Sequence, residues 1–461
     1  MPIKLGTKTP MPMLDPVERS RVFREVNQGY DEARARFEAQ RCLECEDPDC
    51  EKGCPVNVPI QKMAGLIADG RFEDALRAVK AVNALPAVCG RVCPQETQCE
   101  KKCHMAKKFK PVGIGFLERF LADWEIANGR LVEELPEPRK EKIAVVGSGP
   151  AGLTVAGDLA RLGYGVKIFE ALHSSGGVLR YGIPEFRLPK KILDFEIDGL
   201  RRLGVEIECN VVVGKTISME EVLKEYDAVF VGTGAGLPNF LNIPGENLTG
   251  VYSSNEYLTR VNLMKGYLFP QYDTPVQAGR RTVVCGAGNV AMDSVRSALR
   301  LGAEEAVIVY RRTIKEMTAR IEEYEHALEE GIKFNWLTTP VRLIGDDRGW
   351  LKAVELEKMK LGEPDASGRA RPVPTGEKFI MECNTFVIAI GNSPNPLIPM
   401  TTQGIKTNKW GGIIVDENGM TSKDKVYAAG DIVTGAATVI EAAGAGKKVA
   451  AAIHKRLSGG K

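Results

Sequence analysis

The chain has 461 residues, of which 44% are hydrophobic and 26% charged, and 62 Lys and Arg nearly balance 60 Asp and Glu. That length is too great for one ordinary domain, and the composition is that of a globular protein. The near balance excludes strong electrostatic attraction to nucleic acid or anionic membrane. No stretch approaches the roughly 18 apolar residues of a membrane span, and residues 1–16 lack the apolar core of a secretion signal. We therefore expect a cytoplasmic protein with reduced thiols.

Residues 1–135 are expected to form a helical domain. Apolar residues recur at helical spacing in four segments, 17–30, 31–45, 60–83 and 113–129. A Pro- and charge-rich stretch, 134–142, follows and is typical of a linker.

Beyond the linker the pattern changes to strand, glycine turn, helix and strand, the sequence of a βαβ unit. This pattern occurs at 142–171 and again at 281–312, and the C-terminal tail has one short strand and a small-residue helix that we expect to complete the first unit. The fold class is therefore α/β, with two Rossmann-like dinucleotide-binding domains, one inserted in the other, after the helical domain. The expected boundaries are 136–250 and 393–461 for the two parts of the first domain, and 251–392 for the second.

The first unit carries G-x-G-x-x-G directly after the strand KIAVV. The first glycine permits a tight turn, the second lets the backbone approach a pyrophosphate, and the third lets helix pack on strand. The helix that starts there offers free N–H groups to phosphates, and an acid ends the next strand, where it can accept hydrogen bonds from ribose hydroxyls. The residues of this predicted dinucleotide site are Gly147, Gly149, Pro150, Ala151, Gly152 and Glu170.

The second unit has the variant G-x-G-x-x-A, and its second strand ends in Arg311 and Arg312 instead of an acid. Guanidinium groups can clamp a 2′-phosphate that an acid would repel, so the pattern favours NADP(H) over NAD(H). The alternative is a solvated strand end. The other predicted residues of this site are Gly286, Gly288, Asn289, Val290 and Ala291.

Eight of the eleven cysteines lie within the helical region, at spacings of 2-4-3 and 3-5-3 intervening residues. A disulfide framework, a zinc site and iron–sulfur clusters are the three interpretations. Disulfides are unusual in a large cytosolic chain, and zinc ribbons repeat matched C-x2-C pairs. The Cys-Pro ending resembles the bacterial ferredoxin motif, which favours clusters. The three remaining cysteines, Cys209, Cys285 and Cys383, are expected to be small buried hydrophobes.

The segments GSGPAGL, VGTGAG (231–236) and YAAGDI (427–432) resemble the flavoproteins with two dinucleotide domains. This resemblance implies FAD in the first unit and the nicotinamide nucleotide in the second. Residues 316–323 are expected to shape the NADPH pocket, and an arginine near the flavin would stabilise negative charge. The further FAD residues expected on this basis are Gly177, Leu179, Arg180, Tyr181, Gly234, Gly430, Asp431, Thr438 and Val439.

The motifs CLEC, GCPV, LPAVCGRVCPQETQCEKKC and GIGFLERF resemble the glutamate synthase small-subunit family over essentially the whole chain. That family includes part of dihydropyrimidine dehydrogenase and the large subunit of NADH-dependent reduced ferredoxin:NADP oxidoreductase. The resemblance implies two [4Fe–4S] clusters and leaves Cys89 without a ligand role. The first cluster would be held by Cys42, Cys45, Cys50 and Cys103, and the second by Cys54, Cys93, Cys99 and Glu118.

The expected function is that of an NADP(H)-dependent FAD and iron–sulfur oxidoreductase subunit. No protein acid or base is expected to be catalytic, because the flavin carries the chemistry, and His104 and His326 are expected to be structural. The partners are expected to be ferredoxin and a second flavoprotein subunit in an electron-bifurcating complex, to which the resemblance is nearer. The alternative partner is a glutamate synthase large subunit, and no nucleic acid or membrane partner is expected.

Overall fold

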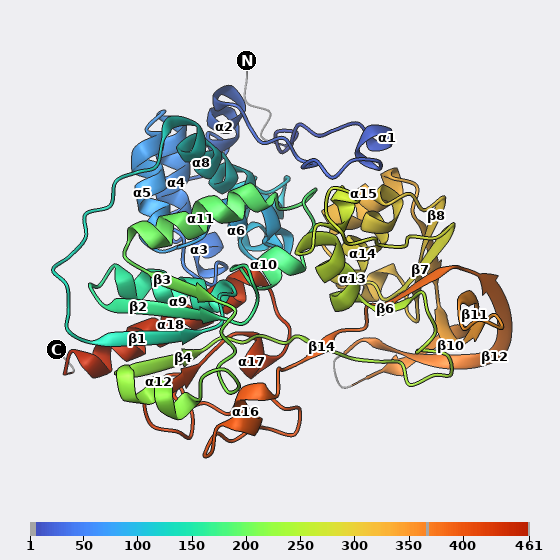
Figure 1. Cartoon of the computed structure of the whole chain (residues 1–461). Coiled ribbons are helices and arrows are strands. Elements are labelled where there is room, and N and C mark those ends of the chain that lie inside the picture. The colour runs from blue at the N-terminus through green and yellow to red at the C-terminus, as the bar shows by residue number, and fades with distance from the viewer. Residues whose placement is uncertain (1–5, 366–367, 460–461) are drawn as a thin grey trace.

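The computed structural model describes residues 6–365 and 368–459, and within them two five-stranded parallel sheets organise the chain (Figure 1). The first sheet has the order β15-β4-β1-β2-β3. Its central strand is buried along four of its five residues because Val and Ile face helices on both sides. The strands are β1 (Lys142–Val146), β2 (Gly165–Glu170), β3 (Glu206–Cys209), β4 (Ala228–Val231) and β15 (Val426–Ala428).

The C-terminal strand β15 pairs in parallel with β4, with Val426 opposite Val229. The long C-terminal helix packs closely on the helix after β1, since a Cβ added at Gly446 would lie 2.8 Å from the Ala151 carbonyl oxygen. The tail therefore completes the first sheet and its helical cover. The helices of this unit are α9 (Pro150–Ala160), α10 (Val178–Tyr181), α11 (Lys190–Arg202), α12 (Met219–Glu225), α16 (Leu397–Thr401), α17 (Asp431–Thr434) and α18 (Val439–Leu457).

The second sheet has the order β6-β13-β7-β8-β9 and lies beside the first unit (Figure 1). Two short strands, β5 (Leu237–Pro238) and β14 (Asn392–Ser393), pair where the chain passes between the units. The strands are β6 (Val251–Ser253), β7 (Arg281–Cys285), β8 (Glu305–Tyr310), β9 (Lys333–Trp336) and β13 (Thr385–Ile388), and the helices are α13 (Ser254–Asn262), α14 (Asn289–Arg300) and α15 (Ile321–Glu329).

A third, antiparallel sheet extends from the second unit at the far side from the termini (Figure 1). It is formed by β10 (Thr338–Gly345), β11 (Leu351–Pro364) and β12 (Ala370–Glu382). The first half of β11 mixes buried and exposed residues, as a half-buried strand does, and its distal part is exposed. The sequence analysis did not anticipate this sheet.

The N-terminal region is helical, as expected, in its second, third and fourth segments. The segment 60–83 forms two helices separated at Gly70, which has a φ of +79°. The helices are α2 (Glu32–Ala39), α3 (Asp49–Lys52), α4 (Ile60–Ala68), α5 (Phe72–Lys80), α6 (Pro86–Val92), α7 (Cys99–Lys102) and α8 (Ile114–Asn128). Among the described residues, none of the helices has the length and apolarity needed to cross a bilayer.

The helix expected over 17–30 is wrong. Within residues 11–30, here called the N-terminal strap, only α1 (Pro16–Arg19) is helical. The rest is irregular, with turns and bends, and lies against the second unit (Figure 1). The buried Arg19 side chain pairs with Glu329 and Glu330 beside α15, and Met13 forms an isolated bridge with Asn27. These tertiary contacts override the local helical spacing of the strap.

The three cysteines outside the helical region are free thiols. Cys285 and Cys383 are buried in the core of the second unit, as expected. Cys209 is only half-buried because it ends β3, the edge strand of the first sheet.

Candidate functional site

The first glycine loop leaves room for a ligand where the sequence predicted one. A Cβ at Gly147 would lie 2.7 Å from the Gly232 carbonyl oxygen, and one at Gly152 would lie 2.0 Å from the Gly147 carbonyl oxygen. A Cβ added at Gly149, by contrast, would have the Gly232 carbonyl oxygen as its nearest neighbour, at 4.0 Å. Since α9 begins at Pro150, the free N–H groups of its first turn meet this open space. The loop therefore fits a pyrophosphate.

Glu170 is buried at the end of β2 and is held beside this loop. Its carboxylate accepts hydrogen bonds from the Ser148 backbone N–H at 3.0 Å, from the Ser148 hydroxyl, and from the Leu172 N–H at 2.8 Å. A carboxylate has further lone pairs for ribose hydroxyls. The sequence pattern contained no signal for the part that Ser148 plays in fixing this acid.

A cavity of about 220 Å³ opens at the carboxyl ends of the first sheet. The buried hydroxyl of Thr233, on its wall, has no hydrogen-bond partner among the described residues, so a ligand atom there would satisfy it. Burial raises the pKa of Asp431 to about 6, against the effect of a hydrogen bond from the Ala437 N–H at 3.2 Å. Of the predicted FAD residues, the cavity is lined by Gly149, Pro150, Ala151, Gly234, Asp431, Thr438 and Val439.

Two predicted glycines shape this cavity from outside its wall. Gly177 has a φ of +53°, and a Cβ there would lie 2.8 Å from the Gly149 Cα. Gly430 has a φ of +75° and lies against Ala151, 3.2 Å from an added Cβ. Tyr181, expected at the flavin, also lines the cavity. The sequence analysis missed other residues of the wall, among them Ile183, Arg187, Asn255 and Asn392.

Leu179 and Arg180, which were expected to line the flavin, do not line this cavity. Leu179 is fully buried in the core between α10 and α11. The Arg180 guanidinium turns to the opposite side, where it donates to the Ser175 carbonyl at 2.5 Å and pairs with Asp194. One turn of helix explains both, because α10 presents Val178 and Tyr181 to the cavity.

The second glycine loop borders a cavity of about 470 Å³. A Cβ at Gly286 would lie 2.2 Å from the Ala389 carbonyl oxygen, and Ala291 is fully buried where α14 packs on the sheet. The predicted residues that line the cavity are Gly286, Gly288, Asn289, Val290, Arg311 and Arg312. Thr318, Thr338 and Arg369 also line it, and the last comes from the unanticipated β11–β12 hairpin.

The two arginines after β8 have different surroundings. Arg312 is 5% exposed, donates to the Ala370 carbonyl at 2.9 Å and pairs with Asp365 at 2.6 Å. Arg311 is exposed and lines the cavity, and no ion pair or hydrogen bond of its side chain is found among the described residues. Arg311 is therefore available to a phosphate, whereas Arg312 anchors the hairpin.

The two cavities meet at the first turn of α14, because Asn289 and Val290 line both. Beside them, the Arg187 guanidinium pairs with Asp293 at 2.8 Å and with Glu323 at 3.0 Å. Both Arg187 and Asp293 also line the first cavity. A dinucleotide lying along the second cavity would thus reach into the first at this junction.

The predicted ligands of the first cluster all line one small pocket, together with His104, which bonds to Asp49 at 2.8 Å. Burial and the neighbouring thiols of Cys103 and Cys42 raise the pKa of Cys50 to about 12. Burial also raises the pKa of Cys42, and four cysteines gathered in one pocket are suited to a positively charged metal centre. His104 thus has a structural partner.

The predicted ligands of the second cluster form a separate, deeper group. Burial, and then the nearby Glu100, Cys54 and Glu118, raise the pKa of Cys99. Burial and the neighbouring Glu196 raise the pKa of Glu118 to about 7, although Asn83 donates to its carboxylate at 2.7 Å. The donor set fits a second cluster. In the described part of the chain, no three His, Cys, Asp or Glu side chains converge closely enough for a single metal ion.

Cys89 also belongs to this deeper group. It is fully buried, interacts with Cys93, and lies 3.7 Å from the Asn83 side-chain oxygen. The sequence pattern left this thiol without a role, and the structure brings it next to a predicted ligand.

The deeper cysteine group abuts the first cavity. Val92 and Pro94, on either side of Cys93, line that cavity, and Gln98 donates to the Thr438 hydroxyl at 3.3 Å. The other group is nearer the surface, where Leu43 is 54% exposed. The order is therefore nucleotide cavity, buried cysteines, surface cysteines.

Comparisons with protein families support this organisation. Residues 19–130 match the 4Fe–4S cluster domain II of dihydropyrimidine dehydrogenase, and residues 136–446 match the pyridine nucleotide-disulphide oxidoreductases. The small chain of NADPH glutamate synthase from Halomonas elongata is 36% identical over 441 residues, 93% of this chain and 92% of that protein. The beta subunit of an NADP⁺-dependent formate dehydrogenase from Moorella thermoacetica is 38% identical over 89% of this chain and 60% of that protein.

Solved structures show the same fold. FprA from Mycobacterium tuberculosis superimposes with a TM-score of 0.59 at 23% identity, over 70% of this chain and 85% of that one. Thioredoxin reductase from Lactococcus lactis does so with a TM-score of 0.53 at 22% identity, over 69% of this chain and all of that one.

Proposed function

The chain belongs to the pyridine nucleotide-disulphide oxidoreductases, among the glutamate synthase small-subunit-like proteins with an N-terminal 4Fe–4S domain, and from this we propose that it is the electron-transfer subunit of a larger complex. It is an NADPH-dependent oxidoreductase that uses FAD and 4Fe–4S chemistry. The observation that supports an electron-transfer role best is the succession of nucleotide cavity, buried cysteine group and surface cysteine group. When bound, FAD exchanges two electrons with NADPH and passes electrons singly to iron–sulfur clusters.

In this proposal the first cavity holds FAD. The glycine loop and the first turn of α9 bind its pyrophosphate, Glu170 binds ribose, and Asp431 lies at the ribityl region. Thr438 caps α18 in a capping box with Glu441, so the positive end of that helix faces the cavity and favours an electron-rich ring.

The second cavity holds NADPH, with its adenosine phosphate at Arg311 and its nicotinamide end at Asn289 and Val290. Arg187 and Asp293 position this junction through their ion pair. Arg320 lies just before α15 and contacts both regions. Its backbone N–H donates to the Asn289 side-chain oxygen at 2.9 Å, and its guanidinium donates to the Gln95 side-chain oxygen at 3.0 Å. These contacts connect the nucleotide loop with the cysteine-bearing region.

The ligand sets proposed for the two clusters are the two cysteine groups, with Glu118 as the non-cysteine ligand. Anaerobically purified protein should contain about eight iron ions and as many inorganic sulfides per chain. Cys99→Ser should lower the iron content to about four, and the matched control Cys209→Ser should leave it unchanged. Zinc without sulfide would refute the electron route.

We propose ferredoxin and a second flavoprotein subunit as partners, in a complex that bifurcates electrons at the FAD. The resemblance of residues 311–334 and 349–365 to the large subunit of NADH-dependent reduced ferredoxin:NADP oxidoreductase supports this choice. The second candidate is the small chain of a glutamate synthase, which full-length similarity to such chains favours. Co-purification from the source cell discriminates between them. A flavoprotein with NAD(H) activity supports the first, and a partner with glutaminase activity supports the second.

A further inference from the structure

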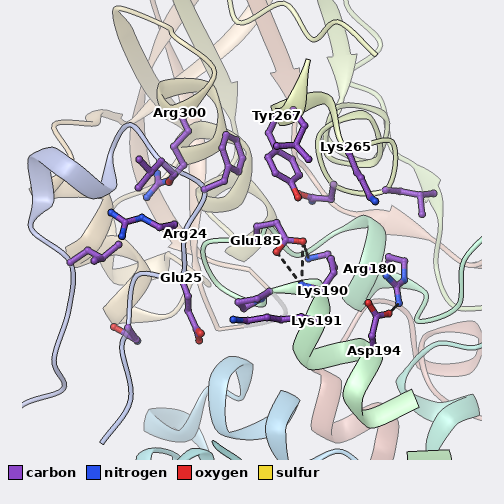
Figure 2. A pocket seen from close by; sticks show the side chains of 18 of the residues that line it. Arg24, Glu25, Arg180, Glu185, Lys190, Lys191, Asp194, Lys265, Tyr267 and Arg300 are labelled. Carbon is purple, nitrogen blue, oxygen red and sulfur yellow. Dashed lines mark hydrogen bonds and ion pairs between the residues drawn. The ribbon is translucent and has the colours of Figure 1, made fainter. Parts of the chain in front are cut away.

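A further cavity lies outside both nucleotide sites. It has a volume of about 1000 Å³ and is walled by the N-terminal strap, by the start of α11, and by α13 with the 3₁₀ turn Gly266–Leu268 (Figure 2). None of the glycine-loop residues lines it. It lies where three parts of the chain that are distant in sequence come together, a common position for ligand sites.

The lining is strongly cationic, with seven Lys and Arg against three carboxylates. Figure 2 shows that the cations come from different walls, with Arg24 on the strap, Lys190 and Lys191 on α11, and Lys265 and Arg300 on the second unit. This convergence from several sides distinguishes the cavity from an ordinary solvated helix face.

Several of these cations are not neutralised by the protein. Among the described residues, Arg21 and Lys191 have no ion-pair partner, and Lys265 donates only to the neutral Tyr272 hydroxyl, at 2.9 Å. Lys190 donates to the Ile183 and Leu188 carbonyls, at 2.6 and 2.8 Å, and its nearest carboxylate is 3.8 Å away. Arg21, Lys191 and Lys265 are therefore available to an anion, whereas Lys190 is paired with Glu185.

The cavity also has acceptors without donors. Asn262 is 2% exposed, and its Oδ1 has no hydrogen-bond partner in the described part of the chain while its amide donates to Tyr181. The Oδ1 of Asn27, on the strap, is likewise without a partner there. Buried acceptors left unsatisfied are costly, and a hydroxyl-bearing ligand would satisfy them.

An aromatic wall completes the lining. The rings of Phe23 and Tyr267 are stacked with centroids 4.7 Å apart and both line the cavity. Free cations suit phosphates, unsatisfied amide oxygens suit sugar hydroxyls, and an aromatic wall suits a planar ring.

We propose that this cavity binds a nucleoside phosphate, at a site separate from the FAD and NADPH sites. An acidic segment of a partner subunit is the competing occupant. A small ligand is favoured because it can contact all three walls inside the hollow, whereas a protein surface would meet mainly the rim. A nucleoside phosphate bound there would contact the strap, the first unit and the second unit together.

The test uses the holoenzyme with saturating NADP⁺, so that the nicotinamide nucleotide site is occupied. Calorimetric titrations are made with ADP, ribose 5-phosphate and pyrophosphate. We expect ADP to bind most tightly, ribose 5-phosphate to follow, and pyrophosphate to bind through the cations alone. Equal affinities for all three would reduce the site to a phosphate site and contradict the nucleoside assignment.

The matched variants reverse exposed charges. Arg21→Glu with Lys191→Glu should raise the dissociation constant for ADP at least about tenfold, since each cation contributes a charge-assisted contact. Arg202→Glu, an exposed position at the other end of α11 with no ion pair among the described residues, should leave it unchanged. If the wild type binds none of the probes at millimolar concentration, or if the double variant binds ADP as tightly as the wild type does, the proposal is refuted. Loss of the partner subunit in the double variant without any ADP binding would assign the cavity to a protein contact.

Discussion

Replacing Arg311 by alanine should weaken NADPH binding selectively. The Arg311 side chain lines the second cavity without an ion pair or hydrogen bond among the described residues, so its full guanidinium is available to the 2′-phosphate. Hydrogen bonds to charged groups contribute about 1.5–3 kcal/mol. The expected loss is therefore roughly ten- to 150-fold in NADP⁺ affinity. NAD⁺ has no phosphate at this position, and its affinity should change by no more than about twofold, as for other surface substitutions.

Arg312→Ala is the matched comparison, because Arg312 is buried and bonded to Asp365 and Ala370. Loss of the Arg312 side chain should loosen the β11–β12 hairpin and weaken the binding of NADP⁺ and of NAD⁺ to a similar extent. The assay is calorimetric titration of each holoenzyme with NADP⁺ and with NAD⁺. Arg311→Lys keeps the charge but not the planar guanidinium, so its affinity for NADP⁺ should lie between those of the wild type and Arg311→Ala. The reasoning fails if Arg311→Ala weakens the binding of NADP⁺ and NAD⁺ equally. It also fails if only Arg312→Ala changes the ratio of the NADP⁺ affinity to the NAD⁺ affinity.

Three further predictions follow from the same contacts. Gly152→Ala places a Cβ 2.0 Å from a carbonyl oxygen and should cost about 1–3 kcal/mol of stability and reduce the flavin content, whereas Gly236→Ala, with no atom within 4 Å, should retain it. Cys89→Ser should keep the iron content that Glu118→Ala lowers, if Glu118 is the fourth ligand, and iron analysis of both variants decides. Although burial would raise it, Arg187 and Arg296 hold the pKa of Glu323 at about 2, so wild type should exceed Glu323→Gln in urea stability at neutral pH, by a margin that shrinks as pH falls from about 5 towards 2.

The glycine loops and the strands before them could be predicted because the backbone itself requires those residues. Gly147 has a φ of +99° and Gly286 one of +139°, and in both cases a Cβ would collide with a carbonyl oxygen of a neighbouring segment. Such constraints are local and are visible in the sequence. The cysteines differ, because only the family resemblance implied that Cys103 joins Cys42, Cys45 and Cys50, which do line one pocket together.

Side-chain direction could not be predicted in the same way. Leu179 and Arg180 follow two glycines and were expected at the flavin, but a single turn of α10 directs one into the core and the other to the opposite side. Arg312 lies next to Arg311, yet the position of the β11–β12 hairpin, set by distant pairing, determines that it is buried. The strap shows the same limit, because Glu330, over 300 residues away, provides the partner for Arg19.

Buried charges help to hold α14, whose first turn forms the junction of the two cavities. The carboxylate of Glu330 accepts from Arg296 at 2.7 Å, from Arg300 at 2.8 Å and from Arg19 at 3.2 Å, and all three arginines are at least nine-tenths buried. Buried ion pairs add little net stability compared with apolar packing, but each tolerates only a narrow geometry, and removing one partner is costly. Such a network constrains how the strap and α14 lie against α15. Since α14 also carries Asn289 and Val290, the same charges constrain where the second cavity opens into the first.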